Sequence, residues 1–190
     1  MVTSKSNLYF SPAEYLEAET HSPVKHEYID GQVYAMAGAS DAHNLITGNA
    51  YVLLRNHLRG SGCLPYSGDM KARIEIRNIF YYPDVMVTCD PRDRTAEYAK
   101  SYPSLIIEVL SDSTEAFDRG DKFADYRHLD SLQEYVLIKQ DRCDVDCFRR
   151  NKNNRWELYS FAEADELELQ SVNFKCAIAS LYEDVIFAHD

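Results

Sequence analysis

Apolar and polar side chains alternate along residues 69–77, and a period of two over this length predicts a β-strand with one exposed face. The polar positions hold three cations, Lys71, Arg73 and Arg77, together with one glutamate. In a strand these side chains share one face, because every second residue points to the same side. The segment therefore predicts a locally basic strand face.

Two further runs, residues 81–89 and 105–110, consist mainly of β-branched, aliphatic or aromatic residues between proline, aspartate and serine. Continuous apolar runs of this length are typical of central strands that are buried on both faces. Each run nevertheless contains one carboxylate, Asp84 in the first and Glu108 in the second. A buried carboxylate needs a partner or a metal ion, because burying an unpaired charge is costly.

Helical patterns separate these strands. Residues 11–14, Ser-Pro-Ala-Glu, combine an N-cap, a first-turn proline and a capping-box glutamate, and predict a helix that ends near residue 22. Apolar positions at helical spacing predict a core-packing helix at about residues 41–58. A third helix is expected at about residues 114–129, despite Gly120 within it.

More strands are expected before and after these helices. The pair Asp30-Gly31 suits the positive φ angles of a tight turn, which predicts a hairpin of residues 26–29 and 32–36. Further strands are expected at residues 135–138, 145–148 and 156–161. A strand end or a helix at residues 174–188 closes the chain, so the whole pattern predicts an α/β protein.

A chain of 190 residues that is 45% hydrophobic can bury a core of ordinary size, and no linker or repeat divides it, so one domain spanning residues 1–190 is expected. The net charge of −11 opposes non-specific attraction to nucleic acid. The five cysteines contain no CxxC pair and follow no secretory leader, so they indicate neither a disulfide framework nor a zinc cluster. This cysteine usage fits a reducing cytoplasm. No apolar run approaches the roughly 18 residues that span a bilayer, so no membrane partner is expected.

Asp84 and Glu108 carry the candidate chemistry. If their strands lie side by side, the two carboxylates can converge on one edge of the sheet and bind a hard divalent cation such as Mg²⁺, which prefers oxygen ligands. A cation there can polarise a phosphoryl oxygen and activate water. The alternative interpretation is that each acid pairs with an arginine or lies at an exposed strand end.

Lys122 is the third candidate, on the helix that follows the Glu108 strand. An ammonium beside the metal can orient or deprotonate the attacking water and offset the charge that develops on a phosphate. The alternative interpretation is an exposed helical ion pair with Asp118, four residues earlier.

Several short motifs occur together and in order. They are His26-Glu27-Tyr28-Ile29-Asp30-Gly31, Pro83-Asp84-Val85, Glu108-Val109-Leu110-Ser111, Ser113-Thr114, Asp118-Arg119-Gly120-Asp121-Lys122 and Glu134-Tyr135. Over residues 11–138 the set resembles the small bacterial "putative restriction endonuclease" family of the PD-(D/E)XK nuclease superfamily. The resemblance implies a restriction-endonuclease-like mixed β-sheet flanked by helices, with an N-terminal helix and β-hairpin, and a metal-dependent DNA endonuclease.

The resemblance also implies roles for individual residues. It makes Asp84 and Glu108 the ligands of Mg²⁺ or Mn²⁺, and Glu27 an additional acidic member of the catalytic site. In the usual superfamily pattern the catalytic lysine stands two positions after the second acid, where this chain has Leu110. Similar members supply the lysine from the following helix, and Lys122 matches that arrangement.

His43 lies near the start of the predicted helix 41–58, where family members tend to carry histidine, and is expected to approach the phosphate or the metal; a capping or core role is the alternative. Lys71, Arg73 and Arg77 on the basic strand face are candidates for DNA contacts. Further candidate cations at the rim are Arg92, Arg94, Arg149, Arg150 and Lys152. In an acidic protein such cations also serve solubility and local ion pairs.

The sequence is compatible with three functions: a metal-dependent DNA endonuclease, a non-catalytic DNA-binding or interaction module on the nuclease fold, and a metal-dependent hydrolase of another substrate. DNA is the expected substrate of the first. A homodimer is favoured, because cutting both strands of a duplex is simplest with two sites. Metal-dependent cutting, binding without turnover, and substrate profiling separate the three.

Overall fold

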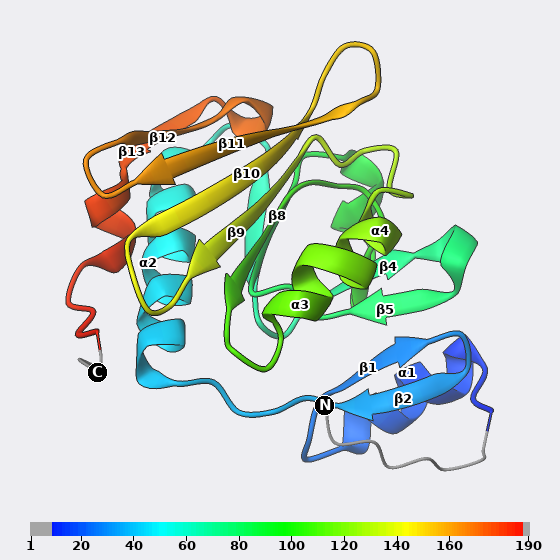
Figure 1. The fold of residues 1–190 in the computed structure, drawn as a ribbon. Helices are drawn as coiled ribbons and strands as arrows, with labels where there is room; N and C mark the ends of the chain where they lie inside the picture. The colour runs from blue at the N-terminus through cyan, green and yellow to red at the C-terminus, as the bar shows by residue number, and fades with distance from the viewer. Residues whose placement is uncertain (1–8, 188–190) are drawn as a thin grey trace.

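The computed structural model describes residues 9–187, in which two large β-sheets and several helices are arranged in layers (Figure 1). The larger sheet contains β3 (Leu64–Ser67), β6 (Val85–Thr88), β8 (Pro103–Leu110), β9 (Glu134–Lys139), β10 (Asp144–Arg150) and β11 (Trp156–Ala162). The second contains β1 (His26–Ile29), β2 (Gln32–Ala35), β4 (Lys71–Ile74), β5 (Ile79–Tyr81) and β7 (Ala99–Lys100). The C-terminal hairpin pairs β12 (Glu166–Leu169) with β13 (Phe174–Ala177).

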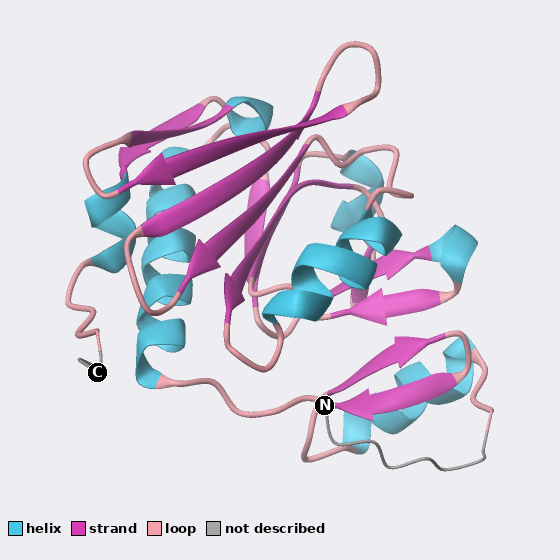
Figure 2. Ribbon diagram, viewed as in Figure 1, coloured by secondary structure: helices cyan, strands magenta, loops and turns pink. Residues whose placement is uncertain are grey.

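Both large sheets are mixed. The six-stranded sheet has the order β11-β10-β9-β8-β6-β3, in which β8 and β9 run parallel and the other neighbours run antiparallel. The five-stranded sheet has the order β2-β1-β5-β4-β7, in which β4 and β7 are parallel. With helices on their faces (Figure 2), the sheets confirm the expected fold class, a mixed β-sheet flanked by helices.

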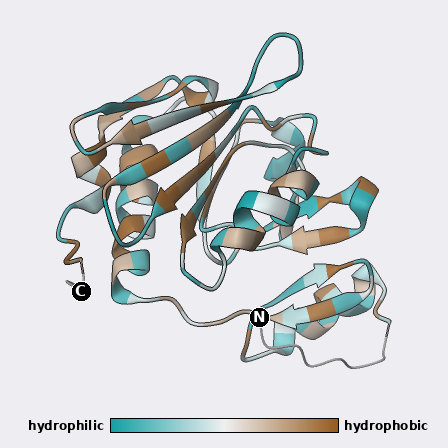
Figure 3. Ribbon diagram, in the orientation of Figure 1, coloured by the Kyte–Doolittle hydropathy of each residue, from teal (hydrophilic) through white to brown (hydrophobic). Residues whose placement is uncertain are grey.

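The six-stranded sheet is buried on both faces. On one face, Ile46, Ala50 and Leu54 of α2 (Asp41–His57) pack in one cluster with β6, β8 and β9. The hairpin β12–β13 and the 3-10 helix Ile178–Tyr182 extend this layer. On the other face, α4 (Phe123–Tyr126) packs together with β4 and β5 in a second cluster. Figure 3 shows how β8 and β9, between these layers, are largely hydrophobic, as the apolar run 105–110 predicts.

The N-terminal helix and hairpin form as expected. Helix α1 (Pro12–His21) begins with both halves of the capping box between Ser11 and Glu14. Asp30 and Gly31 connect β1 and β2 with φ angles of 44° and 86°, which suit a tight hairpin turn. Tyr15 of α1 is buried against the five-stranded sheet, so this helix covers the outer face of that sheet.

The run 81–89 is divided between the two sheets. β5 ends in the five-stranded sheet, and β6 begins at Val85 in the six-stranded sheet. Residues 82–84 cross between them, and Pro83 in this crossing has no N–H to donate to a strand ladder. The prediction of one continuous strand is therefore wrong, and Asp84 lies at the crossing instead of within a strand.

The alternating segment 69–77 forms a shorter strand than expected. β4 ends at Ile74, and a 3-10 helix, Glu75–Arg77, follows. Lys71 is only 6% exposed, and its ammonium lies over the ring of Tyr82 at 4.9 Å from the centroid. The expectation that this face of the strand is exposed is wrong at Lys71, because Tyr82 in the segment after β5 covers it.

The third expected helix is interrupted by a wider turn. It consists of α3 (Glu115–Phe117), a π-helical segment Asp118–Lys122 that contains Gly120, and α4. Such a π-turn within a helix is rare and often occurs at functional sites. Among the helices of the described chain, none is long and apolar enough to cross a membrane.

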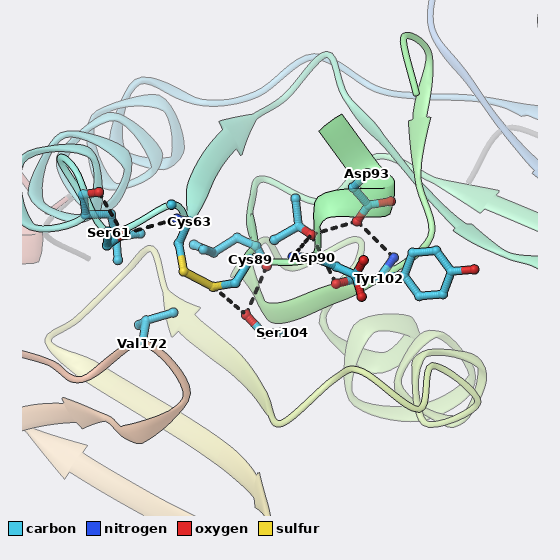
Figure 4. Close-up of a disulfide and its surroundings, with 12 residues drawn as sticks. Ser61, Cys63, Cys89, Asp90, Asp93, Tyr102, Ser104 and Val172 are labelled. Carbon is cyan, nitrogen blue, oxygen red and sulfur yellow. Dashed lines mark hydrogen bonds between the residues drawn. A yellow bond between two sulfur atoms is a disulfide. The ribbon is translucent and has the colours of Figure 1, made fainter. Parts of the chain in front are cut away.

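A disulfide joins Cys63 to Cys89 (Figure 4). Leu64 pairs with Thr88 where β3 meets β6, and the two cysteines are the next residues outward. The sequence did not indicate this bond, because the cysteines are 26 positions apart and only the register of two strands brings them together. The other three cysteines, Cys143, Cys147 and Cys176, are free.

Candidate active site

Four residues singled out in the sequence meet where the two large sheets approach each other. Glu27 comes from β1 in the five-stranded sheet, and Glu108 comes from β8 in the six-stranded sheet. Asp84 lies on the crossing between the sheets, and Lys122 on the π-turn. Four separate segments thus supply one cluster.

Strand register holds Asp84 beside Glu108. β6 and β8 are antiparallel, with Val85 opposite Ile107, so the residues just beyond this pair are neighbours. The Val109 N–H donates to Asp84 Oδ2 at 2.7 Å, and the Asp84 N–H lies 3.4 Å from Glu108 Oε2. The two acids are therefore on neighbouring backbone segments at one edge of the sheet.

Lys122 is surrounded by carboxylates. Its Nζ lies 2.9 Å from Glu108 Oε1, 3.3 Å from Glu27 Oε1 and 3.4 Å from Asp118 Oδ1. The Lys122 side chain is 7% exposed, and its ammonium lies over the ring of Tyr81. The contact with Asp118 that the alternative interpretation expected does exist, but it is buried and is one of three.

The π-helical segment directs Asp118 and Lys122 toward the sheets. Asp118 and Lys122 are buried, whereas Asp121 between them is exposed. The turn is tied to β9 because the Tyr135 hydroxyl donates to the main-chain oxygen of Asp118 at 3.0 Å. The position of the ammonium thus depends on a local distortion of the helix as well as on its own ion pairs.

The cluster contains four acids, Asp84, Glu108, Glu27 and Asp118, and one lysine. Burial raises the pKa of Glu108 well above its ordinary range, Lys122 opposes this, and Asp118 and Asp84 add to it. Burial alone would lower the pKa of Lys122, but Glu108 and Glu27 hold the pKa of this ammonium well above its ordinary range. Several acids facing one lysine make a site that favours an added proton or cation.

Two further residues connect to the acids. His43 lies at the start of α2, and its Nε2 is 2.9 Å from Asp84 Oδ1. Its backbone N–H also donates to Ser40, the N-cap of that helix. The Tyr126 hydroxyl donates to Glu108 Oε1 at 3.1 Å. Tyr126 was not found from the sequence, although its place four residues after Lys122 was a usable signal.

The candidate DNA-contacting cations do not join this cluster. Lys71 is buried under Tyr82, Arg73 pairs with Glu75 at 3.2 Å, and Arg77 pairs with Asp125 at 3.2 Å. Of the rim cations, Arg92 pairs with Asp90, Arg94 donates to the Gly62 carbonyl and Arg149 pairs with the buried Glu134. These cations serve mainly local contacts within the chain.

The donor set at Asp84 and Glu108 fits a hard cation. Each acid has an oxygen that accepts a single contact, so lone pairs remain for a metal. No three His, Cys, Asp or Glu side chains within residues 9–187 are grouped as a complete metal site. Mg²⁺ commonly uses one or two carboxylates and completes its shell with water or phosphate oxygens, so a pair of acids suffices.

Comparison with known sequences gives consistent matches over most of the chain. The model of the Uma2 family, described as "Putative restriction endonuclease", matches residues 12–179. The uncharacterized protein slr1290 of Synechocystis sp. is 41% identical over 177 residues, which is 93% of each chain. The uncharacterized protein sll1609 of the same organism is 35% identical over 160 residues, 83% of this chain and 90% of that one.

Comparison with solved structures supports the fold. A crystal structure from Anabaena variabilis, described as a putative nuclease belonging to DUF820, superposes with a TM-score of 0.74. The match covers 93% of this chain and 99% of the other, at 16% sequence identity. At this level of identity the likeness shows that the two chains share a fold.

Proposed function

Because the chain belongs to the Uma2 family, described as "Putative restriction endonuclease", we propose that it is a metal-dependent DNA endonuclease that hydrolyses phosphodiester bonds. Asp84 and Glu108 hold Mg²⁺ or Mn²⁺ in this proposal, and Lys122 assists the attacking water. Glu27 completes the acidic cluster, and His43 supports Asp84.

One observation carries the proposal: an ammonium lies 2.9 Å from Glu108 Oε1, and Glu108 is the neighbour of Asp84. Two carboxylates for a hard cation and a lysine within reach are the groups that phosphodiester hydrolysis needs. A divalent cation bound there polarises a phosphoryl oxygen and lowers the pKa of water.

The residues around Lys122 have distinct tasks in this proposal. Lys122 orients the water and offsets negative charge on the phosphate. Glu27 and Asp118 hold the ammonium in place while Glu108 uses its oxygens for the metal. His43 fixes the orientation of Asp84, because its ring nitrogen lies 2.9 Å from Oδ1.

The test is a matched cleavage assay of wild type, Lys122→Ala, Lys122→Arg and Asp84→Ala. Substrates are supercoiled plasmid, linear duplex and single-stranded DNA, with Mg²⁺, with Mn²⁺, and with EDTA as the metal-free control. We expect metal-dependent cutting by the wild type and a loss of roughly 10²-fold or more in single-turnover rate for Lys122→Ala, the scale of losing an acid-base or charge-stabilising group. Full activity of Lys122→Ala would contradict the role of the lysine.

A second candidate function is a DNA-binding module without turnover. The contacts of Lys122 favour this function, because its ammonium already neutralises part of the acidic cluster without any metal. Position 110, which holds lysine in the usual motif, is also a leucine. Binding of DNA by a wild type that cuts none of the substrates would support this function over the endonuclease.

We also propose that the endonuclease acts as a homodimer, since two sites are needed to cut both strands in one encounter. Light scattering of the wild type at micromolar concentration tests this directly. A monomer mass that persists in the presence of duplex DNA would contradict it.

A further inference from the structure

An open hollow lies at the end of α4, some distance from the acidic cluster. Its volume is about 250 Å³. It is lined by Ala124, Arg127, His128, Arg150, Asn154 and Trp156. The hollow thus lies between the end of the helix that carries Lys122 and the loop that joins β10 to β11 (elements labelled in Figure 1).

The lining is cationic and aromatic. Two arginines and a histidine line it without any carboxylate, although the whole chain has a net charge of −11. The Arg150 guanidinium lies 4.8 Å from the centre of the Trp156 ring, and Arg127 and His128 are exposed. Asp130 is the nearby acid that favours the charged form of Arg150, against the burial that lowers its pKa.

Arg150 is only partly explained by a structural role. Its guanidinium donates to the main-chain oxygens of Arg127 and Leu129 at 3.1 and 3.0 Å, which ties the helix end to β10. Its Nε is buried and has no hydrogen-bond acceptor among the described residues. That buried Nε is out of a ligand's reach, so the groups that suit this concave site to an anionic, planar ligand are the exposed Arg127 and His128 beside the indole of Trp156.

We propose that this hollow binds a nucleotide of the DNA strand outside the bond that is cut, with the phosphate on Arg127 and His128 and the base against Trp156. This inference rests on the proposed nuclease function and extends it to the substrate path. Cations that follow the backbone and an aromatic ring on which a base stacks are the two features that hold a single strand.

The distance between the hollow and the acidic cluster is one that a single DNA strand can span. Glu108 is paired with Leu137 on β9, and the Arg150 N–H donates to the Gln133 oxygen just before that strand. Four residues of strand separate these positions, or about 13 Å along β9, and Glu108 and Arg150 lie on the strands to either side of β9, about 10 Å apart across the sheet. Trp156 also packs against the same core cluster as Leu137, so the hollow and Glu108 are on one face of the sheet. The resulting span of about 16 Å corresponds to roughly five nucleotides at the rise of a duplex strand.

Trp156 is the single tryptophan of the chain, so its fluorescence reports on this hollow. The full-length protein is titrated in EDTA, where no metal supports cleavage, with a 12-nucleotide single-stranded DNA. Inorganic phosphate and a deoxynucleoside monophosphate are titrated separately, to distinguish a strand from a free phosphate or nucleotide. We expect saturable quenching by the 12-mer that weakens with added salt, and little response to the small ligands.

The variants isolate the hollow. Arg127→Ala and His128→Ala each remove an exposed lining residue, and Arg127→Ala is expected to raise the Kd about 10-fold and reduce the salt slope by about 0.7. Arg155→Ala is the matched control, because this exposed arginine is on the adjacent loop but outside the lining, and it should change the Kd less than 2-fold. Asp84→Ala should retain the quenching.

The outcomes separate this inference from the proposed function. Unchanged Trp156 emission, or equal Kd values for Arg127→Ala and Arg155→Ala, overturns the inference even if the wild type cuts DNA. Equal responses to phosphate and to the 12-mer also overturn it, because the hollow would then be a simple anion site. Quenching that depends on Arg127 in a protein that cuts no DNA supports the inference and refutes the endonuclease.

Discussion

Replacing Lys122 by methionine tests the energetics of the acidic cluster most directly. Methionine is also unbranched and is only one heavy atom shorter than lysine, so the substitution removes the charge with little change in packing. The ammonium that is lost contacts three carboxylates, those of Glu108, Glu27 and Asp118, and all three are largely buried. Without the ammonium these acids must take up protons or remain buried and uncompensated.

The expected loss of stability follows from that burial. Removing one partner of a buried ion pair costs about 3–5 kcal/mol, whereas an exposed pair contributes at most about 1 kcal/mol. For a chain of this size each kcal/mol shifts the melting temperature by roughly 2–4 °C, so a decrease of roughly 10 °C is expected. The free energy of unfolding is measured by urea denaturation at pH 7, with thermal melting as a second readout.

Lys175→Met is the matched control. Lys175 also contacts two carboxylates, Glu168 at 3.3 Å and Glu166 at 3.9 Å, but its side chain is 56% exposed. Its removal should cost less than about 1 kcal/mol. Equal losses for Lys122→Met and Lys175→Met would refute the conclusion that the cluster is desolvated and depends on its lysine.

The loss of unfolding free energy in Lys122→Met should also depend on pH, and the burial of Glu108 decides whether it grows or shrinks on acidification. The pKa of Glu108 is raised in the folded protein, so the folded state binds a proton that the unfolded state has already released. Stability from this group is full below the ordinary glutamate pKa and is lost as the pH rises through the folded value. Lys122→Met raises that pKa further, so its deficit should shrink from pH 7 to pH 5. A deficit that grows on acidification would contradict this.

Three further predictions concern individual contacts. Tyr126→Phe removes the hydrogen bond to Glu108 and should cost about 1.5 kcal/mol in urea denaturation; no change would mean that this hydroxyl is also satisfied by water. Mn²⁺ should raise the melting temperature of the wild type but not of Asp84→Asn, and equal shifts would put the metal elsewhere. Cys63→Ser opens the loop closed by Cys89 and should cost about 3.5 kcal/mol under oxidising conditions; the difference from wild type should vanish in reductant, and a persistent difference would point to packing instead.

Local patterns were sufficient to predict most elements. The capping box at Ser11 and Glu14 and the tight turn at Asp30-Gly31 depend only on neighbouring residues, and both are confirmed. The apolar run 105–110 was recognised as a buried strand because its composition reflects burial on both faces. The candidate acids were found for the same reason, since a carboxylate is conspicuous in such a run.

Features that depend on long-range register could not be predicted. The run 81–89 resembles one strand by composition, and only the positions of both sheets show that the chain changes sheet at Pro83. Lys71 is buried under Tyr82, and the Tyr82 hydroxyl donates to Glu19 of α1, more than fifty residues before Lys71 in the chain. The bond between Cys63 and Cys89 likewise depends on how β3 pairs with β6.

The leucine at position 110 and the lysine at position 122 are explained by the same helix. Leu110 is 2% exposed and packs in one cluster with Phe123 and Tyr126 of α4, so that helix covers the strand two residues beyond Glu108. A lysine at position 110 would have to bury its charge under this helix, at high cost. The residue just before α4 instead carries an ammonium to within 2.9 Å of Glu108. The helix that covers the strand therefore leaves no room for a charged side chain at position 110. The same helix supplies the cation instead, because the π-turn before α4 directs Lys122 inward.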